Sequence, residues 1–379
     1  MTSTTLMPQK TEITPPPLHL MIPGPTPLPD SVRTAMGRPA LGHRSPEFKT
    51  VIGQVNDGLQ WVFQTQHPVF CYAASGTGGM EAAFANTLNP GDAVLVLVCG
   101  VFSQRWATMA RMLGATVTEC VAEPGSINSV AQLTQALQEA PTPYKMVVIT
   151  HSETSTGVLN PLQALAETTR RLSPDTLICV DAVTSLGASP LYTDAWDLDL
   201  VMSGSQKGLM IPPGLAFLSV SPRAWAAYEA CQHPSYYFNF GFYKKAFEGT
   251  DSPFTPATHL MLALAEAFRI MQGEGLDAIQ ARHAELKRLT REGVQALGLT
   301  VLVPDATNAS DAVTAIEAPK DMSVADLRQA LKGQHGFLVA DGQAALKGKI
   351  FRIGHLGFQF PRDTQAVLTA LAEVLKGSA

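Results

Sequence analysis

Residues 200–208, Leu-Val-Met-Ser-Gly-Ser-Gln-Lys-Gly, are an apolar run that ends in small residues and a single lysine, Lys207. A lysine at a strand end can lie in a cleft where its amine is partly desolvated. Desolvation lowers the pKa of the amine and makes it a nucleophile toward an aldehyde. The neighbouring glycines and serines leave room for a planar ring. A solvated loop lysine is the alternative, and the turn Ile-Pro-Pro-Gly at 211–214 favours the cleft.

Short apolar runs alternate with helix-length segments on both sides of this stretch. Most runs are apolar throughout, which is typical of strands buried on both faces in a largely parallel sheet. The predicted strands are 69–73, 94–98, 116–121, 146–150, 177–180, 200–202 and 215–220. Amphipathic helices are expected at 103–113, 129–139 and 161–172. This is α/β architecture, in which ligands bind at the carboxyl ends of the strands.

The length of 379 residues suits two domains better than one core. We predict a flexible N-terminal segment over residues 1–20, a large domain over 21–255 and a smaller C-terminal α+β domain over 256–379. In the smaller domain the expected helices are 256–272, 276–296, 324–331 and 362–375, and the expected strands are 300–303, 312–317, 337–340 and 350–353.

Composition excludes several classes of protein. Apolar residues are 46% and charged residues 16% of the chain, which excludes a disordered protein. The net charge of −5 provides no cationic surface for nucleic acid. No apolar run reaches the roughly 18 residues of a membrane-spanning helix. The five scattered cysteines and the unpaired histidines predict neither disulfides nor a metal site. With no apolar core of a secretory signal at the start, we expect a cytoplasmic protein.

Two further segments carry chemistry at predicted strand ends. Residues 176–183, Thr-Leu-Ile-Cys-Val-Asp-Ala-Val, end a strand in Asp181, which could hold a proton on a pyridine nitrogen or cap a turn. Residues 75–82, Ser-Gly-Thr-Gly-Gly-Met-Glu-Ala, could bind one phosphate at a helix N-terminus or form a plain tight turn. Glu81 replaces the third glycine of a dinucleotide motif, and no Gly-Lys-Ser/Thr of a P-loop follows.

The glycine loop, Asp181 and Lys207 follow one another in the order found in fold-type-I pyridoxal-phosphate enzymes. The chain resembles the class V aminotransferases, and within them the alanine/serine–glyoxylate aminotransferases. The matching stretches are 23–27, 42–46, 75–78, 89–92, 153–158, 180–187, 203–207 and 351–357, and they span nearly the whole chain beyond residue 20. The resemblance implies a fold-type-I transferase with a mostly parallel seven-stranded sheet in the large domain, and pyridoxal 5′-phosphate as cofactor.

The resemblance also implies roles for individual residues. Lys207 would bind the cofactor aldehyde covalently and move the proton from the substrate Cα, while Asp181 would pair with the pyridinium nitrogen. Arg352 and Gly24 would contact the substrate, with the guanidinium forked onto its carboxylate. Arg352 could instead reach a surface carboxylate.

Other residues would surround the cofactor. They are Thr77, Gly78, Gly79 and Gln206 at the phosphate, Phe102 and Val183 on the two faces of the ring, Thr154 near its 3-oxygen, and Thr255 at the phosphate of a partner subunit. Ordinary core packing is the alternative for Phe102, and a turn is the alternative for Thr154.

The activity implied is a ping-pong transamination from alanine or serine to glyoxylate, which gives glycine and pyruvate or hydroxypyruvate. Its partners would be small amino acids and 2-oxo acids, in a homodimer with shared active sites. The alternatives are an aminoethylphosphonate–pyruvate transaminase, a desulfurase, or a non-catalytic subunit that keeps the cofactor fold within a larger complex. No cysteine follows Cys231, which disfavours a desulfurase. The presence of Lys207, Asp181 and Arg352 disfavours a non-catalytic subunit.

Overall fold

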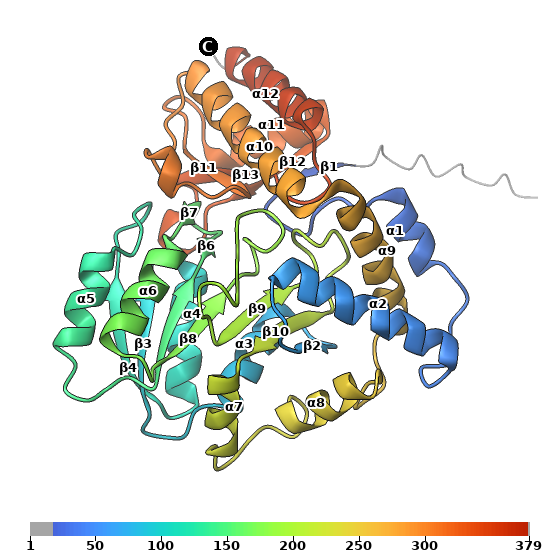
Figure 1. Ribbon diagram of the computed structural model, residues 1–379. Helices are drawn as coiled ribbons and strands as arrows, with labels where there is room; N and C mark the ends of the chain where they lie inside the picture. The colour runs from blue at the N-terminus through green and yellow to red at the C-terminus, as the bar shows by residue number, and fades with distance from the viewer. Residues whose placement is uncertain (1–17, 378–379) are drawn as a thin grey trace, which may run out of the picture.

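The computed structural model of the protein describes residues 18–377 (Figure 1). Its centre is a seven-stranded sheet with the order β2-β10-β9-β8-β5-β3-β4. The strands are β2 (Val69–Tyr72), β3 (Ala93–Val98), β4 (Thr116–Val121), β5 (Met146–Thr150), β8 (Leu177–Asp181), β9 (Leu200–Gly204) and β10 (Ala216–Val220). Within this sheet β10 runs antiparallel to the other six strands, which are all parallel to one another. The predicted mostly parallel seven-stranded sheet is confirmed.

Helices cover both faces of this sheet, which explains why most of its strands are apolar throughout; the edge strand β4 is the exception, with no buried residue. One face packs on α2 (Pro46–Phe63), α5 (Val130–Gln138), α6 (Leu162–Leu172) and α9 (Thr258–Glu274). The other face packs on α3 (Gly76–Ala85), α4 (Val101–Met112), α7 (Pro222–Glu229) and α8 (Phe240–Glu248). Adjacent residues of β3 show the alternation, because Leu95 lies in the first core and Val96 in the second.

A second, four-stranded sheet has the order β1-β12-β13-β11 and lies in the upper part of Figure 1. Its strands are β1 (His19–Met21), β11 (Val313–Glu317), β12 (Phe337–Asp341) and β13 (Ile350–Gly354). It packs on α10 (Leu276–Ala296), α11 (Val324–His335) and α12 (Pro361–Lys376). The described part of the chain therefore begins in the second unit, passes through the large one and returns.

Two expectations about these elements are wrong. His19 and Leu20 belong to the predicted flexible segment, but they pair in parallel with Phe337 and Leu338 of β12, whose other neighbour is the antiparallel strand β13. The rest of that segment lies outside the described residues. The predicted strand at 300–303 is reduced to a single bridge between Val301 and Ile316. The carbonyls of Val303 and Pro304 accept hydrogen bonds from Arg291 instead of continuing a ladder.

The domain boundary at residue 255 stays a prediction. Helix α9, which follows it, packs against α1 (Asp30–Met36) and α2 of the large unit, whereas α10 packs against α12. Helices α1, α2, α7 and α8 were not predicted. For α2 a signal was present: the hydroxyl of Ser45 accepts a hydrogen bond from the N–H of Phe48, and Pro46 occupies the first helical position.

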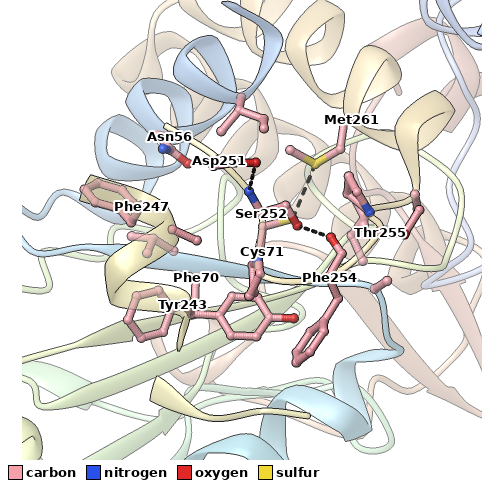
Figure 2. A pocket seen from close by; sticks show the side chains of 18 of the residues that line it. Asn56, Phe70, Cys71, Tyr243, Phe247, Asp251, Ser252, Phe254, Thr255 and Met261 are labelled. Carbon is pink, nitrogen blue, oxygen red and sulfur yellow. Dashed lines mark hydrogen bonds between the residues drawn. The ribbon is translucent and has the colours of Figure 1, made fainter. Parts of the chain in front are cut away.

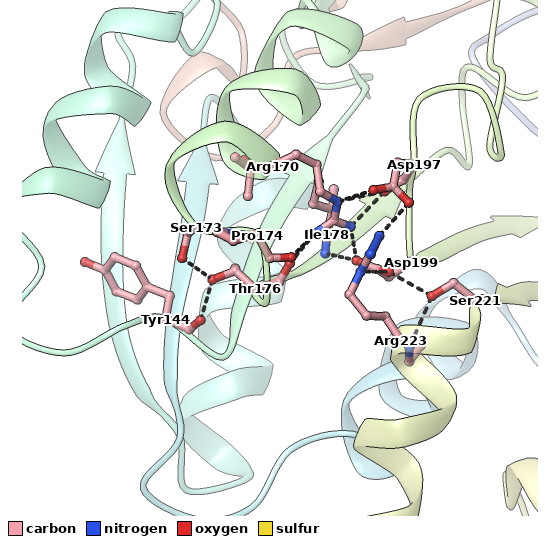
Figure 3. A network of polar contacts seen from close by, with 12 residues as sticks. Tyr144, Arg170, Ser173, Pro174, Thr176, Ile178, Asp197, Asp199, Ser221 and Arg223 are labelled. Atoms are coloured by element: carbon pink, nitrogen blue, oxygen red, sulfur yellow. Dashed lines mark hydrogen bonds and ion pairs between the residues drawn. The ribbon is translucent and has the colours of Figure 1, made fainter.

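A buried carboxylate ties the amino ends of β8 and β9 together (Figure 3). Asp199 accepts hydrogen bonds from the N–H of Ile178 at 2.8 Å and the hydroxyl of Ser221 at 2.8 Å. It also pairs with Arg170 from α6 and Arg223 from α7. The network rigidifies the amino ends of these strands. The predicted ligand-binding residues gather at the opposite, carboxyl ends.

No helix within residues 18–377 is long and apolar enough to cross a membrane.

Candidate active site

The carboxyl ends of the parallel strands open into a cavity of about 350 Å³. The loops after β2, β3, β5, β8 and β9 and the N-terminal segment all contribute to its wall. Among the residues predicted to be functional, the cavity is lined by Gly24, Thr77, Phe102, Thr154, Asp181, Val183, Gln206 and Lys207. The topology therefore brings together side chains that are far apart in sequence.

Lys207 lies in the cleft rather than in a solvated loop, and only 9% of it is exposed. Its amine donates a hydrogen bond to the carbonyl of Pro23, and its own carbonyl accepts one from the Thr26 hydroxyl at 3.0 Å. Burial first, and then the positive charge of Arg352, lower the pKa of Lys207 to about 8, while Asp181 acts in the opposite direction. A sizeable fraction of the amine is therefore neutral and nucleophilic near neutral pH.

Gly24 is needed for this approach of the N-terminal segment to the lysine. Its φ of +132° is in a region that side chains rarely adopt. A Cβ at this position would lie 2.7 Å from Cδ and 2.9 Å from Nζ of Lys207. Any larger residue would therefore displace either the segment or the lysine.

Asp181 ends β8 beside the cavity with both carboxylate oxygens engaged. Oδ1 accepts a hydrogen bond from the N–H of Val183 at 3.0 Å, and Oδ2 accepts one from the indole N–H of Trp106 at 3.0 Å. Burial raises the pKa of Asp181, and these two hydrogen bonds act to lower it. Each oxygen keeps lone pairs for a further donor, so the carboxylate can both shape its own turn and bind a protonated nitrogen.

The glycine loop forms the start of α3 with Ser75 as its N-cap. The N–H groups of Gly78 and Gly79 donate to the carbonyl of Ser75 at 2.8 and 3.4 Å. Within residues 18–377, the N–H groups of Gly76 and Thr77 donate no hydrogen bond. These first amides at the positive end of the helix are thus free for an anion.

Gly78 and Gly79 do not line the cavity. A Cβ on Gly79 would lie 3.1 Å from the side chain of Met202 and 3.3 Å from that of Ala216, and one on Gly78 would lie 2.7 Å from that of Ala74. These two glycines allow α3 to pack closely on its surroundings, while Gly76 and Thr77 offer the open donors.

Gln206 and Arg105 add polar groups near this helix end. Oε1 of Gln206 is buried, and within the described residues it has no hydrogen-bond partner, so the amide is available to a ligand. The guanidinium of Arg105 lies 5.0 Å from the centre of the Phe102 ring and donates to the hydroxyl of Thr77 at 2.9 Å. Sequence reasoning missed Arg105, because the predicted helix 103–113 begins after Phe102, whereas α4 begins at Val101 and places the two residues three positions apart in one helix.

Glu153 holds Phe102 at the cavity. This fully buried side chain follows β5 in the short strand β6 (Ser152–Glu153), which pairs with β7 (Val158–Leu159). Its carboxylate accepts hydrogen bonds from the N–H groups of Phe102 at 3.1 Å and Ser103 at 2.9 Å, and from the hydroxyl of Ser155 at 2.6 Å. A negative charge at the start of α4 is favourable, because the helix dipole is positive there. Sequence analysis assigned Glu153 no role.

Arg352 reaches from β13 of the second sheet to the large unit. Its Nε and Nη2 donate to the carbonyl of Asp341 at 2.9 and 2.7 Å, and its Nη1 donates to the carbonyl of Thr154 at 3.0 Å and to Oε1 of Gln343 at 3.3 Å. It is 5% exposed and forms no ion pair within residues 18–377, which rules out the surface-carboxylate alternative there. Arg352 itself is not among the residues that line the cavity, but its partner Thr154 is. The hydroxyl of Thr154 is 2.6 Å from that of Thr184 on the cavity wall.

Thr255 is not part of the cavity of its own chain. It is exposed and lines a separate small cavity of about 40 Å³ between α2, α8 and α9 (Figure 2). Figure 2 shows it beside Phe254, while Tyr243 lies farther to the left in the view; all three residues line this small cavity. A role of Thr255 at a phosphate would require a second subunit.

Comparisons with known proteins identify the family. A family model described as aminotransferase class-V matches residues 31–355. A protein of Synechococcus sp. named soluble hydrogenase, small subunit, is 45% identical over 357 residues, which cover 94% of this chain and 92% of that protein. The serine–glyoxylate aminotransferase of Methylorubrum extorquens is 35% identical over 346 residues, which cover 89% of this chain and 86% of that enzyme. The crystal structure of an alanine–glyoxylate aminotransferase from Nostoc sp. matches with a TM-score of 0.90 at 31% identity and covers 97% of both chains.

The cavity fits the cofactor of this family. Pyridoxal phosphate needs an amine for its aldehyde, a carboxylate for its ring nitrogen and donors for its phosphate. The buried Lys207, the doubly hydrogen-bonded Asp181 and the free amides of Gly76 and Thr77 meet these needs around one cavity. The predicted fold class, family and cofactor are confirmed: this chain belongs to the class V aminotransferases, and its cofactor is pyridoxal 5′-phosphate.

Proposed function

We propose that the protein is a transaminase that transfers the amino group of alanine or serine to glyoxylate by a ping-pong mechanism. The products are glycine and either pyruvate or hydroxypyruvate. The observation that carries the proposal is that Lys207 and Asp181 line one cavity, while Arg352 of β13 donates a hydrogen bond to the carbonyl of Thr154 in the wall of that cavity and its charge lowers the pKa of Lys207. The names of the two aminotransferases reported above support glyoxylate as the acceptor.

The residues of the chain divide the chemistry among them. Pyridoxal phosphate supplies, when bound, an aldehyde carbon for covalent attachment and a ring that delocalises electrons. The neutral amine of Lys207 attaches the cofactor and afterwards accepts the proton of the substrate Cα at Nζ. Asp181 holds a proton on the ring nitrogen. Arg352 orients the substrate carboxylate, and Glu153 keeps Phe102 at the ring face.

Arg352 is held ready for this role by its surroundings. Three backbone and side-chain oxygens, from Asp341, Thr154 and Gln343, fix the guanidinium plane without neutralising its charge. The longest of these contacts, 3.3 Å to Gln343, is the one that an incoming carboxylate most easily replaces. A charged acceptor forms stronger hydrogen bonds than an amide oxygen does.

We also propose that the chain forms a homodimer, in which Thr255 of the partner subunit helps to bind the phosphate. Exposed aromatic side chains near Thr255 support the proposed dimer. Around α8 and the loop before it, Tyr236 is 76% exposed, Tyr237 40% and Phe242 43%, and their rings contact one another or Phe254 beside Thr255. Clustered exposed aromatic rings are typical of interfaces.

A second candidate function is that of a subunit in a larger complex. The name of the 45% identical relative favours it. The buried lysine and carboxylate, Lys207 and Asp181, favour catalysis instead.

We also propose that the protein is located in the cytoplasm. This location fits the free cysteines of the described part of the chain, which are Cys71, Cys99, Cys120, Cys179 and Cys231.

The first prediction tests the activity. The protein with pyridoxal phosphate, glyoxylate and either alanine or serine should form glycine, measured by chromatography. Lys207→Ala should lower turnover at least about 10²- to 10⁴-fold, because it removes the general base. Borohydride reduction followed by peptide mapping should find the cofactor on Lys207. Absence of glycine with every donor, from protein that does carry the adduct, would leave the subunit role as the better reading.

The second prediction concerns the pH dependence of cofactor attachment. Only the neutral amine attacks an aldehyde, and the pKa of Lys207 is lowered to about 8. The rate constant of attachment to the cofactor-free protein should therefore rise about tenfold per pH unit below about pH 8 and level off above it. Stopped-flow absorbance measures this rate. A plateau reached only near the ordinary lysine pKa of 10.5 would contradict a desolvated amine.

The third prediction concerns substrate binding. Arg352→Ala should raise the KM for donor and acceptor roughly 30-fold, since a hydrogen-bonded charge pair contributes about 2 kcal/mol in ground and transition states alike. It should also raise the pKa of Lys207, because the charge of Arg352 lowers it. Arg328→Ala is the control, because Arg328 also contacts Asp341 but, within residues 18–377, donates no hydrogen bond to Thr154 in the cavity wall. Unchanged KM values in Arg352→Ala would reject the assignment.

The fourth prediction concerns the dimer. Phe242→Asp should convert a dimer into a monomer in sedimentation velocity, because a charge replaces an exposed ring of the aromatic cluster. Met112→Asp is the matched control, since Met112 is 83% exposed at the end of α4 and away from this cluster. A wild-type protein that sediments as a monomer at micromolar concentration would refute the interface.

A further inference from the structure

Trp106 is a buried residue whose polar atom serves the site. Its side chain is 0% exposed and packs edge-on against Phe84, with ring centres 4.9 Å apart. A buried indole N–H needs an acceptor. Here the acceptor is Oδ2 of Asp181 at 3.0 Å rather than a nearby backbone carbonyl. The ring therefore belongs to the core, whereas its N–H acts on the carboxylate at the cavity wall.

This hydrogen bond determines the orientation of the Asp181 carboxylate. Oδ1 accepts a hydrogen bond from the N–H of Val183, which lies in the same turn. This bond alone would allow the carboxylate to rotate about Oδ1. The bond from Trp106 comes from a different element, α4, and fixes the second oxygen. With both oxygens held, the carboxylate plane has one orientation, and its remaining lone pairs have fixed directions.

The same hydrogen bond favours the ionised carboxylate. Asp181 is buried, and burial raises its pKa, whereas the donors Val183 and Trp106 lower it. A carboxylate that pairs with a protonated ring nitrogen has to be ionised. The indole N–H of Trp106 therefore favours the ionised form of Asp181 and also fixes the orientation of its carboxylate.

Helix α4 couples this contact to the ring-stacking residue. Phe102 and Trp106 are four residues apart and lie on one face of the helix. The start of α4 is held by the carboxylate of Glu153 through the N–H groups of Phe102 and Ser103. One anchored helix thus positions both the aromatic side chain at the cavity and the donor to Asp181.

We propose that Trp106 is a positioning residue, whose indole N–H holds the Asp181 carboxylate ionised and oriented toward the ring nitrogen of pyridoxal phosphate. Trp106 thereby sets how tightly this chain binds its cofactor. The inference rests on the cofactor of the family and is independent of which amino acid and oxo acid react.

The test is a titration of cofactor-free protein with pyridoxal phosphate, followed by visible absorbance. Trp106→Phe keeps an aromatic ring but lacks the donor, and it should raise the Kd about tenfold, since a hydrogen bond to a charged group is lost. Phe84→Leu disturbs the same packing without touching Asp181 and should change the Kd less than about twofold. An unchanged Kd in Trp106→Phe would overturn the proposal.

A double-mutant cycle separates positioning from simple packing. In an Asp181→Ala background, Trp106→Phe should change the Kd less than about twofold, because the acceptor is already absent. An equal tenfold loss in that background would show that Trp106 acts by packing alone, and the proposal would fail. Incorporation of 3-benzothienylalanine at position 106 replaces the N–H by sulfur and keeps the fused-ring shape. It should reproduce the tenfold loss even where Trp106→Phe does not fold, and a wild-type Kd for this variant would equally reject the hydrogen bond.

Discussion

Two opposite charges buried at the ends of neighbouring strands are the constraint on which the rest of the site depends. The carboxylate of Asp181 ends β8, and the amine of Lys207 follows β9, which pairs with β8. Removing either charge from water is costly, so each needs fixed partners. Asp181 has the N–H groups of Val183 and Trp106, and Lys207 has the carbonyl of Pro23. Burial and these partners together leave the amine of Lys207 partly neutral and leave the carboxylate of Asp181 able to accept one more hydrogen bond. A pyridoxal-phosphate site requires both properties.

The partners of these charges come from elements that are remote in sequence, and this couples the two units of the fold. The segment that carries Pro23 and Gly24 leaves β1 of the second sheet and passes over Lys207. Arg352 leaves β13 of the same sheet and bonds to the carbonyl of Thr154 in the large unit. A relative movement of the units would therefore act directly on the lysine and on the proposed carboxylate site. At the opposite edge, the Asp199 network holds the amino ends of β8 and β9, so the sheet itself provides a rigid base.

The candidate residues predicted from the sequence differ in how the structure places them, and the reason is local in each case. Phe102 and Val183 lie at the cavity because their loops follow parallel strands, a position that strand order alone indicates. Gly78 and Gly79 belong instead to the first turn of α3 and its packing, which only the direction of each missing Cβ reveals. Thr255 lies in another cavity, because the loop that carries it joins α8 to α9 and does not follow a strand of the parallel sheet. Trp106 had no sequence signal, and Glu153 lies in the matching stretch 153–158 but was given no role, because a buried tryptophan or glutamate acts only through the partner that it meets in space.

The sequence by itself determined the parallel sheet, the order of glycine loop, aspartate and lysine, and through its motifs the family and cofactor. These follow from local properties: apolar runs of strand length, and small or charged residues placed just after them. Only the tertiary structure decided that β1 joins the second sheet, that Arg352 forms no surface ion pair in the described chain, and that α4 supplies both Phe102 and a donor to Asp181. Such contacts join residues up to hundreds of positions apart, and their geometry depends on packing that no local pattern encodes.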